Sequence, residues 1–147
     1  MSILSQVEKC NGSLFLNNKT QSVRLKKKVK FEENPERLIA FNLLSNDKHS
    51  IFLMELDVED EFIKALDTLP KEVKESIAPK DINVNEGQSE WQKHFSGRRN
   101  VSVFLNNTTQ SVRIPSSFAF ENYEENKTVE VILYQLESGR KVLEIYR

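Results

Sequence analysis

The sequence predicts a mainly β protein in which two copies of one small unit are joined by a helical connector. Three observations support this fold class. The string SLFLNNKTQSVRLKKKVKFEE, which begins at Ser13, returns from Ser102 as SVFLNNTTQSVRIPSSFAFEN. Each copy contains short segments in which apolar and polar residues alternate, as in half-buried strands. The stretch between the copies lacks the repeat and has helical periodicity instead.

Composition narrows the class of protein. With 38% hydrophobic and 29% charged residues in 147, the chain is typical of a soluble globular protein. Its longest apolar segments have the length of a strand, so no membrane-spanning segment is expected. The N-terminus lacks the basic start and apolar run of a signal peptide, and the single cysteine, Cys10, has no internal disulfide partner. We therefore expect a cytoplasmic protein with no membrane contact.

The first half of each copy is expected to be two strands around a turn. A short strand (residues 13–16 and 102–105) leads to the repeated Asn-Asn pair, and asparagine tolerates the left-handed backbone of turns. In the second strand (residues 22–25 and 111–114), apolar and polar residues alternate, so the arginine of each copy should face solvent.

The second half of each copy is expected to be a hairpin. Pro115 favours a short helical turn before the second hairpin, whereas the first copy has Lys26 there, so the copies should diverge at this point. A unit of four short strands in about 45 residues rarely buries enough apolar area to be stable alone, so the two units should interlace into one domain. The expected hairpins pair residues 36–44 with 50–56 and residues 128–136 with 141–146, giving units at 13–56 and 100–147.

The connector, residues 57–99, is expected to be helical. Residues 57–69 place apolar side chains at positions 58, 62, 65, 66 and 69, follow the plausible N-cap Asp57 with acids, and stop at Pro70. A shorter helix is expected at 71–78 and another at 90–95, which carries the only tryptophan.

The repeated strings resemble a known family. FLNNKTQSVRL and FLNNTTQSVRIPSSFAFEN are similar to the N-terminal DNA-binding segment of VapB-type antitoxins, which belong to the AbrB/MazE (SpoVT/AbrB-like) swapped-hairpin group. The pattern of that segment is Val-Phe-x-Asn-x-x-Ser-Gln-Ala-Val-Arg-Leu-Pro followed by a Phe-rich turn. The second copy keeps Phe104, Asn106, Gln110, Val112, Arg113, Pro115, Phe118 and Phe120; the first keeps Phe15, Asn17, Gln21, Val23, Arg24 and Phe31 but lacks the proline.

The resemblance implies a fold and a partner. Two such units would interlace into a small β-barrel, here an intramolecular pseudo-dimer, that lies against double-stranded DNA. A two-fold pair suits a roughly palindromic operator, with each half reading one half-site. Arg24, Arg113, Gln21 and Gln110 are the candidates for base readout, supported by Asn18, Lys19, Asn107 and Thr109, while Lys26, Lys27, Lys28 and Lys30 should give the first copy more phosphate contacts.

The same resemblance implies an antitoxin-like protein that represses its own operon and neutralises a PIN-type ribonuclease toxin. The connector is the candidate for toxin binding, because an apolar helix face can fill a groove of a partner. The residues concerned are Phe62, Leu66, Trp91 and Phe95. The alternative for these residues is that they pack on their own barrel as a structural linker, and the alternative function is a stand-alone AbrB-like regulator or a protein-interaction module without DNA binding.

Several residues have plainer interpretations. The Asn-Asn pairs are also what a turn requires, the two arginines could be solvated or paired with acids, and the lysine run could be a solvated face. We expect Phe15, Phe104, Phe31 and Phe120 in the core. His49 and His94 lie far apart without nearby cysteines, so no metal site is expected, and the sequence lacks the motifs of catalytic or cofactor sites.

Overall fold

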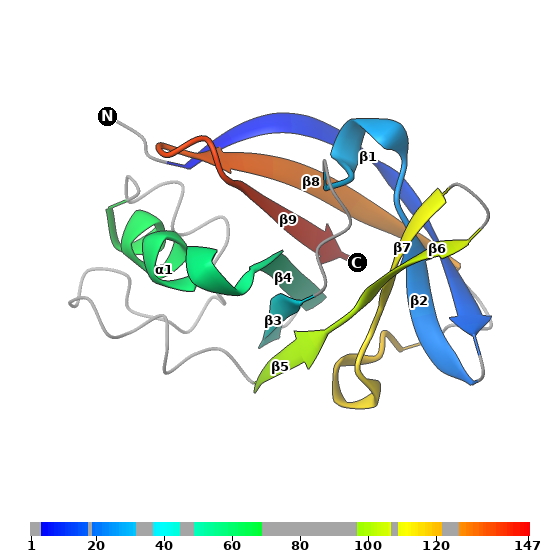
Figure 1. The fold of residues 1–147 in the computed structure, drawn as a ribbon. Helices are drawn as coiled ribbons and strands as arrows, with labels where there is room; N and C mark the ends of the chain where they lie inside the picture. The colour runs from blue at the N-terminus through cyan, green and yellow to red at the C-terminus, as the bar shows by residue number, and fades with distance from the viewer. Residues whose placement is uncertain are drawn as a thin grey trace.

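The computed structural model describes residues 4–17, 19–31, 37–44, 49–68, 97–106, 109–121 and 127–147. Within these residues nine strands form one antiparallel, nearly closed, barrel-like sheet in the order β5-β3-β4-β9-β8-β1-β2-β7-β6 (Figure 1). The expectation of a mainly β fold with a short helix in the connector is confirmed.

The elements follow the same order in both copies. The first copy has β1 (Leu4–Asn17), β2 (Thr20–Arg24), the 3-10 turn η1 (Lys27–Val29), β3 (Leu38–Leu44) and β4 (His49–Glu55). The connector begins with the 3-10 turn η2 (Leu56–Val58) and α1 (Glu59–Thr68). The second copy has β5 (Gly97–Val101), β6 (Val103–Asn106), β7 (Thr109–Arg113), the 3-10 turn η3 (Ser116–Phe118), β8 (Thr128–Leu136) and β9 (Lys141–Tyr146).

The strands of one copy pair with those of the other. β1 pairs with β8, β3 with β5, β2 with β7 and β4 with β9. Val23 lies opposite Val112, and each is the tenth residue after the start of its repeat. Equivalent residues that face each other in an antiparallel pair define a local two-fold axis, so the repeat in the sequence becomes a pseudo-two-fold axis through β2 and β7.

The chain itself nearly closes the barrel. β5 and β6 are the two edges of the sheet, yet only Ser102 separates them in sequence, and the amide of Arg113 donates a hydrogen bond to the Ser102 carbonyl (3.1 Å). In the first copy, the single strand β1 corresponds to β5 and β6 together. It pairs with β8 along most of its length and with β2 near its end.

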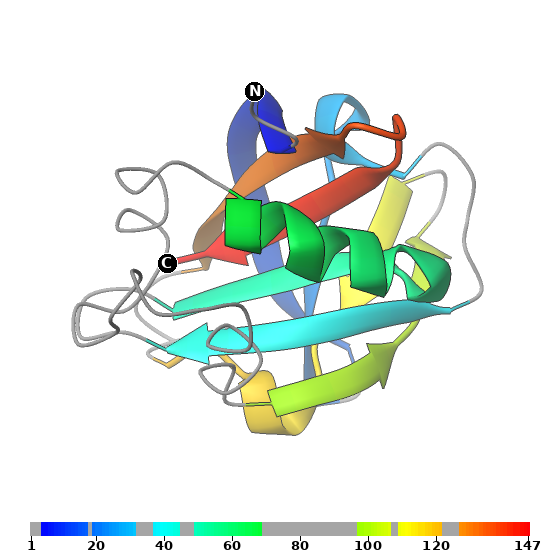
Figure 2. The same ribbon diagram turned by 90° about the vertical axis from the view of Figure 1, so that its left-hand side faces the viewer.

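Two apolar clusters stabilise this arrangement. One fills the barrel and includes Val23, Val112, Ile51 and Leu143. The other lies between α1 and the outer face of β3, β4, β8 and β9, and it contains Phe62. Figure 2 shows α1 crossing in front of these strands. Both faces of β3 and β4 are therefore covered, which explains why their sequences are almost continuously apolar.

Charged contacts hold α1 and η2 on the barrel. Arg98 of β5 donates two hydrogen bonds to the Glu59 carboxylate (2.6 and 2.7 Å). Arg140 lies in the β8–β9 turn and binds both oxygens of Asp57 (2.9 and 3.1 Å), which lowers the pKa of that carboxyl chiefly through the hydrogen bonds. Asp57 and Glu59, two of the acids at the expected start of the helix, thus bind arginines of the second copy.

Some boundaries differ from the expectation. β1 starts at Leu4 and β5 at Gly97, well before the strands expected at 13 and 102, because cross-copy backbone pairing rather than an alternating apolar pattern holds these polar segments. The 3-10 turn η1 forms in the first copy without the proline, so the copies do not diverge in backbone there. The helices expected at 71–78 and 90–95 lie outside the described residues.

Candidate nucleic-acid interface

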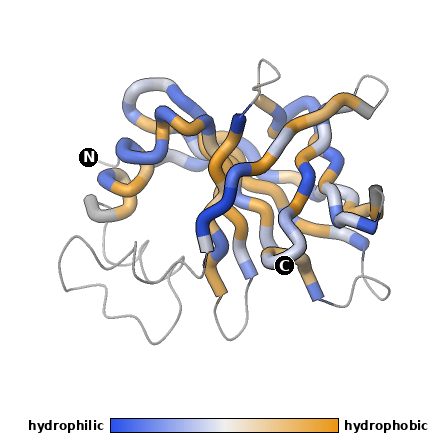
Figure 3. Tube along the Cα trace, turned by 60° about the horizontal axis from the view of Figure 1, so that its bottom comes forward, coloured by the Kyte–Doolittle hydropathy of each residue, from blue (hydrophilic) through white to orange (hydrophobic). Residues whose placement is uncertain are grey.

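The candidate interface is the outer face of the ribbon formed by β2 and β7, flanked by β1 and β6. It lies on the opposite side of the molecule from α1 (Figure 1). Val23 and Val112 face the barrel interior and are fully buried, so their strand neighbours Ser22, Arg24, Ser111 and Arg113 are on the outer face. Figure 3 shows hydrophilic and hydrophobic positions alternating along strands of the barrel. The expected exposure of the two arginines is confirmed.

Each arginine stacks on an aromatic ring of its own copy. The Arg24 guanidinium lies 5.3 Å from the centroid of the Phe15 ring, and that of Arg113 lies 5.5 Å from the centroid of the Phe104 ring. Phe15 and Phe104 are only partly buried, so the expectation that they are core residues is wrong. They lie on the outer face of β1 and β6, where a cation–π contact orients each guanidinium.

The two arginines lie close together across the axis. Arg24 lies opposite Ser111, and Arg113 follows Ser111 by two residues. The arginines are therefore a diagonal cross-strand pair, whose members are typically about 7–8 Å apart. The two guanidinium groups carry like charge on the same face of the sheet, and a ligand with negative potential is attracted to both. The centre of the ribbon is therefore a two-fold pair of oriented donors suited to an anionic or acceptor-rich partner.

The lysines make the interface asymmetric. Lys26, Lys27, Lys28 and Lys30 are all exposed around η1, whereas the equivalent positions around η3 are Pro115, Ser116, Ser117 and Ala119. Lys19 is exposed in the β1–β2 turn, where it has the left-handed φ of 69°. The flank of the first copy thus carries more positive charge than that of the second.

The glutamines belong to the fold. The Gln110 amide accepts a hydrogen bond from the Phe31 backbone amide (2.9 Å) and donates one to the Phe31 carbonyl (3.3 Å). Gln21 makes the same pair of bonds with Phe120, at 2.8 Å each. Each glutamine clamps the segment after the 3-10 turn of the other copy, and Phe31 and Phe120 are buried there as expected. Because both amide groups bind backbone within the fold, we assign Gln21 and Gln110 to structural support rather than to base readout.

The remaining predicted residues fall into three groups. Thr109 is half-buried at the start of β7, while Asn18, Asn107, Trp91 and Phe95 lie outside the described residues. Phe62 and Leu66 are fully buried between α1 and the sheet, so their expected availability to a partner is wrong. The alternative interpretation, packing of α1 on its own barrel, describes these two residues.

Sequence reasoning missed two serines. Ser22 and Ser111 are fully buried on the ribbon, and neither hydroxyl has a hydrogen-bond partner. A buried hydroxyl without a partner costs about 1–3 kcal/mol. The alternation of apolar and polar residues in the sequence predicts that both serines face outward, but it does not predict that they are buried.

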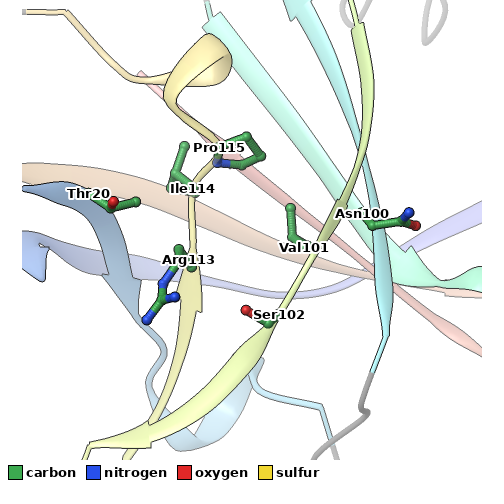
Figure 4. Close-up of a pocket in the computed structure, with 7 residues that line it drawn as sticks. All are labelled: Thr20, Asn100, Val101, Ser102, Arg113, Ile114 and Pro115. Carbon is green, nitrogen blue, oxygen red and sulfur yellow. The ribbon is translucent and has the colours of Figure 1, made fainter. Parts of the chain in front are cut away.

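A small hollow lies beside Arg113. Its volume is about 150 Å³, and it opens between β7, the β5–β6 segment and β2. Figure 4 shows the side chains that line it. They are Thr20, Asn100, Val101, Ser102, Arg113, Ile114 and Pro115. One of its lining residues, Pro115, differs between the copies, since the first copy has Lys26 at that position.

Burial shifts the pKa of titratable groups outside this interface. Glu144 is fully buried and accepts hydrogen bonds from Ser50 (2.7 Å) and Tyr134 (2.8 Å), and burial together with this carboxylate raises the pKa of Tyr134. Burial also raises the pKa of the Cys10 thiol. Among the described residues, no three His, Cys, Asp or Glu side chains are grouped so that they could hold a metal ion.

Comparisons with known proteins add no assignment. A scan against models of protein families, a search of curated proteins and a search of solved structures each found no match to this chain. In the described part of the chain, no helix combines the length and apolar character needed to span a bilayer.

The glutamine clamps predict a graded loss of stability. Gln110→Ala should lower the free energy of unfolding by about 2 kcal/mol, because it leaves the buried amide and carbonyl of Phe31 without partners. Gln21→Ala should cost less, since water reaches its half-buried site. Urea denaturation measures both. Exposed Gln135→Ala is the control and should change stability by less than about 0.5 kcal/mol; a Gln110→Ala variant as stable as this control would refute the clamp.

Proposed function

We propose that this protein is an antitoxin-like, sequence-specific DNA-binding protein that represses its own operon. The observation that carries the proposal is the pair Arg24 and Arg113, exposed on one antiparallel ribbon, each stacked on a phenylalanine and related by the pseudo-two-fold axis. The arginine side chains project from the outer face of the sheet, and arginine in the major groove of B-DNA binds the O6 and N7 atoms of guanine. The symmetry of the pair matches that of a palindromic operator.

The proposal includes a narrower description of the fold. The two copies are AbrB/MazE-like swapped-hairpin units that form an intramolecular pseudo-dimer. Support comes from the pairing of β1 with β8 and of β3 with β5, in which each copy completes the sheet of the other. The resemblance of both repeated strings to the DNA-binding segment of VapB-type antitoxins supports the same description.

The spacing of the arginines refines the proposed readout. Side chains at diagonal cross-strand positions, typically about 7–8 Å apart, reach base pairs at the centre of an operator rather than positions one helical turn apart. We therefore assign Arg24 and Arg113 to the central base pairs. Lys26, Lys27 and the neighbouring lysines would contact backbone phosphates on one side of that centre.

Neutralisation of a PIN-type toxin remains part of the proposal without an assigned surface. Burial of Phe62 and Leu66 removes the apolar face of α1 as a candidate. A gene for such a nuclease next to this one, and co-purification of its product with this chain, would support it. A neighbourhood without that gene would favour a stand-alone regulator.

One observation favours a protein-interaction module as the second candidate. Leu16 and Leu105, which are equivalent residues at the ends of β1 and β6, are 47% and 54% exposed. Exposed leucines in matching places suit a protein partner of similar symmetry. This function requires neither arginine to face DNA, so the substitutions below separate the two candidates.

Loss of both arginines should abolish specific binding. Arg24→Ala with Arg113→Ala should weaken binding to the promoter upstream of the gene about 100-fold or more, since each bidentate contact to a base contributes about 1–3 kcal/mol. Fluorescence anisotropy measures the affinity. Arg37→Ala with Arg99→Ala removes the same charge from exposed positions, one just before β3 and one within β5, and is the matched control. Equal affinities of the two double variants at low salt would contradict the proposal.

The lysine flank predicts a change in salt dependence. Lys26→Gln with Lys27→Gln should reduce the slope of log K against log salt by about 2 while leaving the order of preference among DNA sequences unchanged. Lys64→Gln with Lys141→Gln, on α1 and β9, should leave the slope nearly unchanged. Equal slopes for the two double variants would show that the lysine run is a solvated face.

A further inference from the structure

We propose that Ser22 and Ser111 are specificity-determining residues that contact the central base pairs of the operator together with Arg24 and Arg113. This inference rests on the proposed DNA-binding function. Its starting point is the two hydroxyls that are fully buried on the outer face of the ribbon and have no hydrogen-bond partner.

The register places both serines at the pseudo-two-fold axis. Ser22 is opposite Arg113 and Ser111 is opposite Arg24, with the buried pair Val23 and Val112 between them. The four polar side chains therefore surround the point where the axis leaves the barrel. Two exposed guanidinium groups and two buried hydroxyls lie there in a two-fold arrangement.

Cross-strand neighbours on both sides flank each serine. Ser22 lies between Phe15 on β1 and Arg113 on β7, and Ser111 has the equivalent neighbours Phe104 and Arg24. The guanidinium groups stack on these phenylalanines at 5.3 and 5.5 Å from the ring centroids. A ligand that draws the arginines outward would uncover the hydroxyls at the same time, and their unmet hydrogen bonds would then be made to that ligand.

The chemistry of the four groups favours base edges over phosphate. A phosphate offers acceptors only, whereas a hydroxyl both donates and accepts. The two-fold axis of a palindromic duplex passes between its two central base pairs, and the major-groove edges of these pairs present acceptors and donors side by side. Two arginines and two serines about one axis match a central step that contains guanine or cytosine on each strand, since arginine binds guanine and serine accepts or donates at either base.

The test compares serine variants on defined DNA. Duplexes selected by the wild-type chain from a pool with about 20 random base pairs, two helical turns, provide the probe. Ser22→Ala with Ser111→Ala should weaken binding to the selected duplex roughly 5- to 100-fold, as two neutral hydrogen bonds allow. The same variant should discriminate less against duplexes with a substituted central step and equally against substitutions elsewhere. Its urea midpoint should be equal to or above that of the wild type, because the buried hydroxyls lack partners.

Controls separate the possible failures. Ser5→Ala, exposed near the start of β1, should leave affinity and preference unchanged. Wild-type affinity and central-step preference in the double serine variant, while Arg24→Ala with Arg113→Ala still abolishes binding, would overturn this inference and leave the proposed function standing. A wild-type chain that selects no duplex would overturn both. Competition by inorganic phosphate that depends on the serines would show that the four groups hold a free anion and would also overturn the base contact.

Discussion

The structure depends on the antiparallel pairing of β2 with β7, in which Val23 faces its own repeat equivalent, Val112. This contact joins the two halves of the barrel and places one arginine of each copy on the same outer face. The glutamine clamps form on either side of it and tie each copy to the segment after the 3-10 turn of the other. Because both strands belong to one chain, the pairing is intramolecular and does not depend on protein concentration.

A covalent pair of copies is free to become asymmetric, because a substitution in one half need not be accepted by the other. Three features are the same in both copies: the arginine–phenylalanine stacks, the glutamine clamps and the buried serines. Features on the surface have diverged, with lysines around η1 and Pro115 with two serines around η3. α1 adds a further difference, since this single helix covers the side of the barrel opposite the ribbon. The account therefore predicts a symmetric centre of recognition with unequal flanks.

The sequence predicts those parts of the fold that periodicity encodes. Residues 128–136 and 141–146 form the expected strands, and α1 has the expected apolar face. Periodicity does not reveal β1 and β5, which backbone pairing with the other copy holds in place. Nor does it show that Gln110 binds backbone far away in the sequence, or that Phe15 supports an arginine from outside the barrel. At the candidate site, Arg24 and Arg113 are exposed as predicted, whereas partners distant in sequence determine the roles of the glutamines and serines.

The central claim is that a single chain supplies both halves of a two-fold DNA-binding surface. The stoichiometry of the complex tests it most directly. Native mass spectrometry of the protein with a short palindromic duplex containing one selected site measures the number of chains bound. The account predicts one chain per duplex, with the same value at all protein concentrations that saturate the site. Two chains per single site, or binding that rises with the square of the protein concentration, would contradict it.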